Sequence, residues 1–152
     1  MPESTSNPRR ISVAIADDHP VFRQGVTTLL ALEDDIEVIA MAENGLEAID
    51  MLGRADPDIL LLDLRMPGLD GLGALRRLAH KDLRTRIIVL TASEDQIEYV
   101  QAISDGAHGV LLKQTAVDCL ADCIRAVHSG DLWVDNAALP LPDESTEPAF
   151  RF

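Results

Sequence analysis

The sequence predicts an α/β fold, a doubly wound parallel sheet of five strands with helices on both faces. Short apolar runs alternate with longer amphipathic segments along the chain. Strands that alternate with helices in this way build parallel sheets through right-handed crossovers. Three of the runs are continuously apolar, which is typical of strands covered on both faces.

Five apolar runs are expected to form the strands. In chain order they are residues 11–16, 36–41, 59–62, 87–90 and 110–112. Turn-forming residues agree with this division. Asp56-Pro57 ends the second helical segment, and Gly106 and Gly109 flank a turn before the last strand.

The segments between and after the strands are expected to be helices, because apolar residues recur in them at one-turn spacing. In chain order these residues are Phe22, Val26, Leu29 and Leu30; Leu46, Ile49 and Leu52; Leu72, Leu75 and Leu78; Ile97, Val100 and Ile103; and Val117, Leu120, Ile124 and Val127. The set that starts at Ile97 predicts a shorter and weaker helix, which is expected to be an element of low stability.

The 152 residues are enough for one domain with a core and leave little room for a second. We expect this domain at residues 10–128. Residues 1–9 are rich in Ser and Pro and are expected to be flexible. Residues 129–152 contain several prolines and acidic residues and are expected to be linker-like, although Trp133 is expected to pack back on the domain.

The charge and hydropathy of the chain exclude several classes of function. The sequence has 13 basic and 26 acidic residues and a net charge of −13, which argues against DNA binding by this chain alone. No apolar run approaches the roughly 18 residues that a membrane span needs. The first residues do not resemble a signal peptide, and Cys119 and Cys123 are the only cysteines, so we expect a cytoplasmic protein without disulfides.

Polar residues follow four of the five predicted strands. Asp17 and Asp18 follow the first strand, Asp63 the third, Thr91 the fourth and Lys113 the fifth. The carboxyl ends of parallel strands meet at one edge of a sheet, and such sheets bind ligands there. We therefore expect these five side chains to lie together.

These residue types together suit phosphoryl chemistry. Three carboxylates in one crevice repel each other unless a cation neutralises them, and oxygen ligands of this kind suit Mg²⁺. A hydroxyl and an ammonium can hold the other oxygens of a phosphoryl group. A carboxylate can also act as the nucleophile and form an aspartyl phosphate.

Each of these residues also has an ordinary structural interpretation. Asp17 and Asp18 precede Pro20 and can cap a helix, and Thr91 can cap another. Lys113 can be a surface lysine, and Asp63 can begin a turn. Agreement at four strand ends favours the site over these separate interpretations.

Four motifs resemble the receiver domains of bacterial two-component response regulators, over about residues 10–128. They are Asp17-Asp18, Asp63-Leu-Arg-Met-Pro-Gly-Leu-Asp-Gly71, Thr91-Ala92 and Gly106-Ala-His-Gly-Val-Leu-Leu-Lys113. The segment from Asp18 to Gly25 and the pair Lys113-Gln114 are most similar to the NarL/FixJ (LuxR-type) subfamily. The resemblance implies the CheY-like fold with strand order 2-1-3-4-5.

The resemblance also implies a role for each matching residue. Asp63 would accept the phosphoryl group, and Asp17, Asp18, Asp63 and the backbone carbonyl of Arg65 would hold Mg²⁺. Lys113 would contact the phosphoryl group, and the hydroxyl of Thr91 would move toward it. The remaining residues would shape the site: Met66 and Pro67 in the loop, and Ala92 beside Thr91.

In function, the resemblance implies a signalling switch that is not a metabolic enzyme. A sensor histidine kinase would phosphorylate it, and the domain itself would catalyse only its own phosphorylation and slow dephosphorylation. Members of the subfamily usually carry a DNA-binding transcriptional output domain after a linker. A homodimer through the first or last helices is a further expectation.

Two positions depart from the usual receiver pattern. Val110 stands where receivers commonly have Tyr or Phe, and Gln114 stands where many have Pro. Val110 is short and β-branched, so it cannot make the usual aromatic rotation. The first alternative function is a stand-alone or pseudo-receiver interaction module, which is disfavoured because no acidic ligand, hydroxyl or lysine is missing. The second is an aspartyl-phosphate phosphatase, whose usual Asp-x-Asp motif after the first strand is not matched by Asp17-Asp18-His19. His19 is interpreted as a loop residue rather than a metal ligand.

Overall fold

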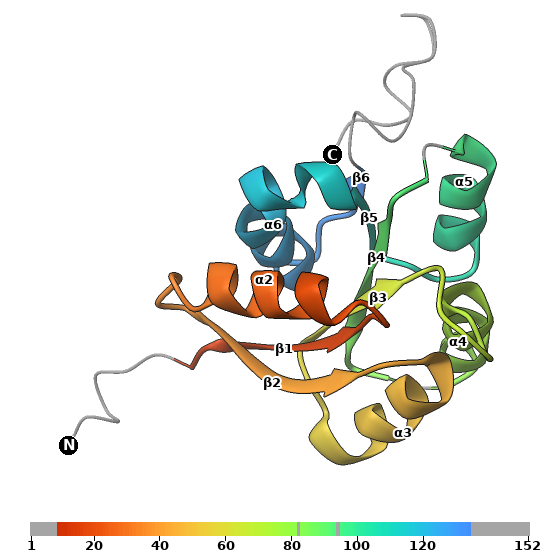
Figure 1. The fold of residues 1–152 in the computed structure, drawn as a ribbon, viewed down its shortest axis with the longest axis horizontal. Coiled ribbons are helices and arrows are strands. Elements are labelled where there is room, and N and C mark those ends of the chain that lie inside the picture. Colours follow the sequence, from red (N-terminus) through yellow and green to blue (C-terminus); the bar gives the residue numbers. More distant parts are fainter. Residues whose placement is uncertain (1–8, 82, 94, 135–152) are drawn as a thin grey trace, which may run out of the picture.

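The computed structural model describes residues 9–81, 83–93 and 95–134 (Figure 1). These residues form a six-stranded parallel sheet in the order β2-β1-β3-β4-β5-β6. The strands are β1 (Ile11–Ala16), β2 (Ile36–Ala42), β3 (Ile59–Asp63), β4 (Arg86–Thr91), β5 (Gly109–Leu112) and β6 (Trp133–Val134). The helices are α2 (Pro20–Leu30), α3 (Gly45–Ala55), α4 (Gly71–Ala79), α5 (Gln96–Ser104) and α6 (Lys113–His128). The predicted α/β class and the order of the first five strands are confirmed.

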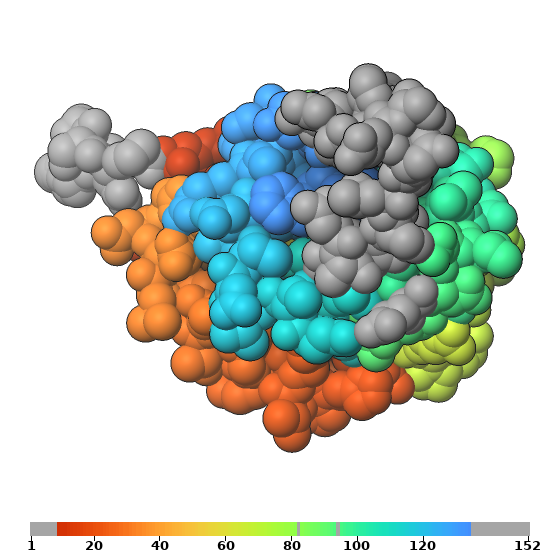
Figure 2. All heavy atoms as spheres, turned by 90° about the horizontal axis from the view of Figure 1, so that it is seen from above, coloured from red at the N-terminus to blue at the C-terminus, as the bar shows by residue number. Residues whose placement is uncertain are grey.

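The helices cover both faces of the sheet, as expected. Helices α2 and α6 lie on one face, where Leu30 and Ile124 pack on Ile15 and Leu61. Helices α3, α4 and α5 lie on the other face (Figure 1). Successive strand residues therefore alternate between two apolar layers, because side chains point to opposite faces of a strand. Figure 2, seen from above, shows the residues of α2 (orange-red) next to those of α6 (cyan to blue).

The sheet has one strand more than the sequence predicts. Strand β6 pairs in parallel with β5, and the backbone N–H of Trp133 donates to the carbonyl of His108 at 3.2 Å. Trp133 is partly buried against the layer beneath α6. Two residues are too few to show a strand periodicity, so the pattern could not reveal β6. The expectations for residues 1–8 and 135–152 fall outside the described residues.

Helix α5 exists as predicted, but the apolar stripe expected for it was wrong. Ile97 and Val100 are 76% and 61% exposed, whereas Tyr99 and Ala102 are buried. Two overlapping stripes compete on this short helix. The stripe that contains Tyr99 faces the core, because an aromatic ring buries more apolar area than the aliphatic side chains of Ile97 and Val100.

The strand register brings the predicted site residues to one edge. Ala16 lies opposite Leu62, so Asp17 leaves β1 next to Asp63 at the end of β3. Asp63 in turn lies opposite Leu90, and Thr91 lies opposite Leu112, the residue before Lys113. The carboxyl ends of the four central strands, β1, β3, β4 and β5, are thus level with one another. None of the helices in the described part of the chain is long and apolar enough to cross a membrane.

A buried aspartate ties three segments together at the opposite edge of the sheet. Asp58 accepts hydrogen bonds from the backbone N–H and the hydroxyl of Ser12, at 2.9 and 3.1 Å. It also pairs with Arg9 at 2.7 Å and with Arg84. Burial alone would raise the pKa of Asp58, but the hydrogen bonds from Ser12 and Arg84 and the charge of Arg9 outweigh it and lower the pKa to about 2.

We expect Asp58→Asn to lower the free energy of unfolding by about 2 kcal/mol at pH 7, in proportion to this lowered pKa. The carboxylate contributes its full stability above its unfolded pKa, and the contribution is lost as the pH falls through the folded pKa. The difference from the wild type should therefore hold between pH 7 and 5 and fall by about half at pH 3. Urea unfolding at these pH values measures it, with the exposed Asp34→Asn as control. A difference that does not change with pH would contradict the assignment.

Candidate functional site

Three carboxylates and one imidazole meet where β1 and β3 end. Asp17, Asp18, His19 and Asp63 each offer one ligand atom, and these atoms all lie within 4.8 Å of one another. Asp17 and Asp63 are buried, whereas Asp18 is half-buried and His19 is exposed. The sequence placed the three aspartates at one edge of the sheet, and the structure brings them together.

Lys113 supplies the positive charge nearest to the buried carboxylates. Its Nζ lies 2.7 Å from Oδ2 of Asp17 and 3.4 Å from Oδ2 of Asp63. The ammonium also lies 4.5 Å from the centre of the Phe22 ring, on the first turn of α2. An aromatic face attracts a cation, so Phe22 helps to hold Lys113 in place.

The pKa of Asp63 is raised above its ordinary value. Burial is the largest cause, and the charge of Asp17 adds to it. The N–H of Arg65 and the ammonium of Lys113 act in the opposite direction without cancelling the effect. The surroundings of Asp63 therefore disfavour the negative charge of its carboxylate.

Three oxygens of these carboxylates indicate a cation site. Oδ2 of Asp17, Oδ1 of Asp18 and Oδ2 of Asp63 are buried and accept no hydrogen bond from the described residues. Buried polar atoms normally have a partner. Lys113 forms ion pairs with the oxygens of Asp17 and Asp63, and Nδ1 of the exposed His19 lies 3.2 Å from Oδ1 of Asp18. A compact group of orphaned carboxylate oxygens fits a hard divalent cation such as Mg²⁺.

The turn after β1 is fixed by its own hydrogen bonds. Oδ1 of Asp17 accepts the backbone N–H of His19 at 2.8 Å, and Nδ1 of His19 lies 3.0 Å from the same oxygen. The guanidinium of Arg23 donates to the backbone carbonyl of Asp17 at 2.6 Å. His19 is the N-cap residue of α2, in agreement with its interpretation as a loop residue.

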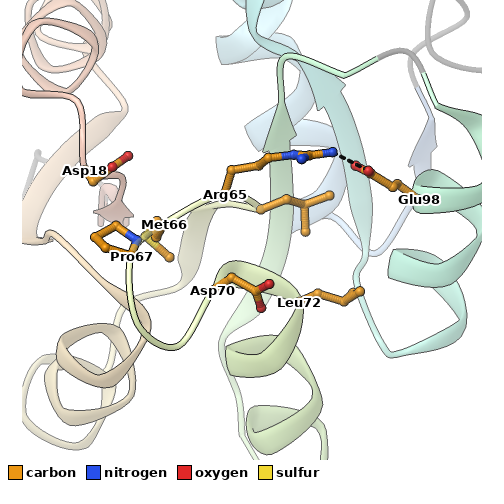
Figure 3. A pocket seen from close by; sticks show the side chains of 8 residues that line it. Asp18, Arg65, Met66, Pro67, Asp70, Leu72 and Glu98 are labelled. Atoms are coloured by element: carbon orange, nitrogen blue, oxygen red, sulfur yellow. Dashed lines mark hydrogen bonds and ion pairs between the residues drawn. The ribbon is translucent and has the colours of Figure 1, made fainter.

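A pocket of about 530 Å³ opens beside the carboxylates (Figure 3). It is lined by Asp18, Leu64, Arg65, Met66, Pro67, Asp70, Leu72 and Glu98. Met66 is buried and Pro67 is exposed, so the two residues predicted to shape the loop form its inner and outer sides. The pocket gives a solvent route to the acidic group.

The loop ends in a glycine that must lie close to the phosphoacceptor candidate. A Cβ at position 71 would lie 1.9 Å from the backbone oxygen of Asp63. The N–H of Gly71 donates to the carbonyl of Leu64 at 3.0 Å, and Asp70 caps α4 through the N–H of Gly73. The absence of a side chain at Gly71 therefore sets how tightly the loop folds over the end of β3.

Arg65 connects the acidic group to α5. Its backbone N–H donates to Oδ1 of Asp63 at 3.2 Å. Its guanidinium binds the carboxylate of Glu98, on the first turn of α5, across the pocket (Figure 3). The side chain thus points away from the carboxylates, while the backbone stays beside them.

The other three residues that the sequence proposed differ in their surroundings. Thr91 is buried, and its Oγ1 accepts the backbone N–H of Ser93 at 3.0 Å. Ala92 is exposed. Val110 is fully buried within the sheet, between Val89 and Val134.

Sequence reasoning missed four residues around the site: Phe22, Arg23, Glu98 and Tyr99. Phe22 and Arg23 follow the Asp17-Asp18 turn by one helical turn, a spacing that could have marked them as neighbours of Asp17. Glu98 and Tyr99 could not be found in this way, because the pattern of α5 suggested a different buried face.

The chain matches the family model described as the response regulator receiver domain over residues 13–125. It is 36% identical to the nitrate/nitrite response regulator protein NarL of Escherichia coli over 136 residues, which are 90% of this chain and 63% of that protein. It is 42% identical to the nitrate/nitrite response regulator protein NarP of the same organism over 130 residues, 86% of this chain and 59% of that protein. The chain therefore spans less than two thirds of the length of these relatives.

Solved receiver structures share the fold. The signal receiver domain of the response regulator NarL from Mycobacterium tuberculosis superposes with a TM-score of 0.70 at 34% identity, covering 78% of this chain and 98% of that one. A LuxR-family response regulator from Aurantimonas gives a TM-score of 0.79 at 28% identity, covering 92% and 96%.

We expect Asp18→Ala to weaken Mg²⁺ binding by about tenfold or more, which is the typical effect of removing a residue that supports a metal site. The loss of one carboxylate also relieves repulsion, so the metal-free domain should be at least as stable as the wild type. Isothermal calorimetry measures the affinity and urea unfolding the stability. Asp34→Ala, which makes the same change of charge in the loop before β2, is the control. Unchanged affinity in Asp18→Ala would remove Asp18 from the cation site.

Proposed function

The chain belongs to the response regulator receiver domains, and from that premise we propose that Asp63 is the phosphoacceptor of a phosphorylation-controlled switch. Receiver domains are signalling domains rather than classical enzymes. The observation that carries the assignment is the position of Oδ2 of Asp63, which is buried beside Asp17 and lies 3.4 Å from the Lys113 ammonium. An attacking carboxylate needs a free oxygen and a nearby cation to stabilise the charge that develops on the phosphoryl group.

In this proposal an oxygen of Asp63 attacks the phosphorus of a phosphohistidine on a sensor histidine kinase. The new O–P bond replaces the N–P bond, and the imidazole leaves and takes up a proton. Lys113 neutralises one phosphoryl oxygen, and the hydroxyl of Thr91 moves to donate to another. Hydrolysis of the aspartyl phosphate later returns the domain to its starting state.

We propose Mg²⁺ as the cation. Asp17, Asp18 and Asp63 would hold it together with the backbone carbonyl of Arg65, which lies in the same loop. A bound Mg²⁺ supplies charge neutralisation to the phosphoryl oxygens. The chain contributes the carboxylate cradle, the buried position of Asp63 and the loop of Met66 and Pro67, which limits access to the pocket.

Phosphorylation should require Asp63. On incubation with acetyl phosphate and Mg²⁺, the wild type should gain one phosphoryl mass in intact-protein mass spectrometry, whereas Asp63→Asn should gain none because an amide is not nucleophilic. The exposed Asp50→Asn on α3 is the control and should label like the wild type. Full labelling of Asp63→Asn would move the phosphoacceptor elsewhere. Catalytic turnover of a phosphate ester would favour a phosphatase instead.

The partners follow from the family. Relatives carry names such as nitrate/nitrite response regulator protein and transcriptional regulatory protein. We propose a sensor histidine kinase as phosphodonor, a cytoplasmic location and a DNA-binding transcriptional output. We propose residues 10–128 as the receiver. Residues 129–152 are proposed as a linker, and β6 lies near the start of this segment. With a net charge of −13, this chain is not the part expected to grip DNA.

We also propose a homodimer through α2 and α6. These helices lie side by side on one face (Figure 2), and an apolar groove runs between them. Val21 and Val117 on its rim are 86% and 71% exposed. In a two-fold dimer the same surface of each copy meets the other, so the apolar residues of one groove would cover those of the second copy.

Val117→Asp should weaken this dimer, because it places a charge in an apolar contact. Sedimentation velocity with the beryllofluoride phosphate mimic measures the effect as a shift from dimer to monomer. Leu46→Asp makes the same kind of change at an exposed residue of α3, on the other face, and should leave the dimer intact. A monomeric wild type, or a Val117→Asp variant that still dimerises fully, would rule out this interface.

A further inference from the structure

The position where receivers commonly place an aromatic residue holds Val110, yet an aromatic side chain packs in the same layer. Tyr99, the single tyrosine of the chain, is fully buried on α5. It belongs to the apolar layer that also contains Val110, Ala102 and Ala107. The ring thus reaches the core from the helix next to β5 rather than from the strand itself.

The hydroxyl of Tyr99 is bound to the loop that follows Thr91. It donates a hydrogen bond to the backbone carbonyl of Ser93. The N–H of the same residue donates to Oγ1 of Thr91 at 3.0 Å. Ser93 is therefore held from both sides, by the candidate switch hydroxyl at its N–H and by the tyrosine at its carbonyl.

A second contact ties the same turn of α5 to Asp63. Glu98 pairs with the guanidinium of Arg65. The backbone N–H of Arg65 in turn donates to Oδ1 of Asp63. Helix α5 buries only Tyr99 and Ala102 fully and leaves Ile97 and Val100 exposed. Polar contacts to the two loops beside Asp63 therefore add to the packing of Tyr99, Ala102 and Ile103 in positioning this helix. Elements that move in signalling are drawn from the parts of a protein with few buried apolar contacts.

We propose that Tyr99 couples phosphorylation of Asp63 to the position of α5. When the hydroxyl of Thr91 leaves the N–H of Ser93 for the phosphoryl group, the backbone of Ser93 loses one of the hydrogen bonds that hold it and its carbonyl moves. The hydroxyl of Tyr99 then follows the carbonyl to which it is bonded, because breaking a buried hydrogen bond is unfavourable. The ring carries α5 with it, and the exposed side chains of Ile97 and Val100 change their position on the surface of the domain. This inference rests on the proposed phosphorylation of Asp63.

The single tyrosine allows a direct test. In protein labelled with ¹³C in the tyrosine ring, each ring position of Tyr99 gives the only signal of its kind. Beryllofluoride with Mg²⁺ should shift these signals in the wild type. In Thr91→Ala, which lacks the acceptor for the N–H of Ser93, the signals should already be displaced and should respond little to the mimic. An unshifted wild-type signal, or a full response in Thr91→Ala, would overturn the coupling.

Tyr99→Phe tests the hydroxyl while keeping the ring. Without the mimic, amide exchange in peptides from residues 95–104 should rise about fivefold, which corresponds to the loss of one hydrogen bond. The change caused by beryllofluoride in these peptides should fall below half of that in the wild type. The matched control is Val100→Ala at the exposed face of the same helix, which should behave like the wild type. Wild-type exchange in Tyr99→Phe would overturn the role of the hydroxyl.

Acetyl phosphate labelling distinguishes phosphorylation of Asp63 from the coupling through Tyr99. Tyr99→Phe should still gain one phosphoryl group, which also shows that the variant is folded. If the wild type is not labelled at Asp63, the proposed function fails. If it is labelled while the tyrosine signals stay unshifted, only the coupling through Tyr99 fails.

Discussion

The repulsion between buried carboxylates at the carboxyl edge of the sheet is the constraint on which the site depends. Parallel strands bring Asp17 and Asp63 side by side, and burial prevents water from screening their charges. One ammonium, that of Lys113, cannot neutralise both together with Asp18. The surrounding contacts, from Arg23 at the first turn to Gly71 at the end of the loop, hold this unfavourable arrangement in place.

Much of this arrangement could be predicted from the sequence because it depends on the order of strands. The five main strands, the helices between them and the residues at the strand ends all follow from apolar runs and the geometry of parallel sheets. Asp17, Asp63 and Lys113 approach each other because each directly follows or ends a strand. Their roles in phosphoryl transfer remain predictions that rest on this geometry and on the family.

What could not be predicted depends on long side chains and on choices between similar packings. Arg65 reaches Glu98 across the pocket, and no spacing in the sequence links residues 33 positions apart. In α5, two apolar stripes competed, and the structure buries the one with Tyr99. Strand β6 is only two residues long, so it left no periodic signal.

That short strand also decides in which direction the chain leaves the domain. Helix α6 begins at the carboxyl edge with Lys113 and runs back to the opposite edge at His128. Strand β6 is parallel to β5, so the backbone reverses and Val134 points again toward the edge that holds Asp63. It does so as the outermost strand beyond β5, so the exit lies on the border of the sheet rather than under a helix. A tether attached at Val134 would therefore start on the outer border of the sheet, and a movement at the acidic group would have to cross β4 and β5 to reach it.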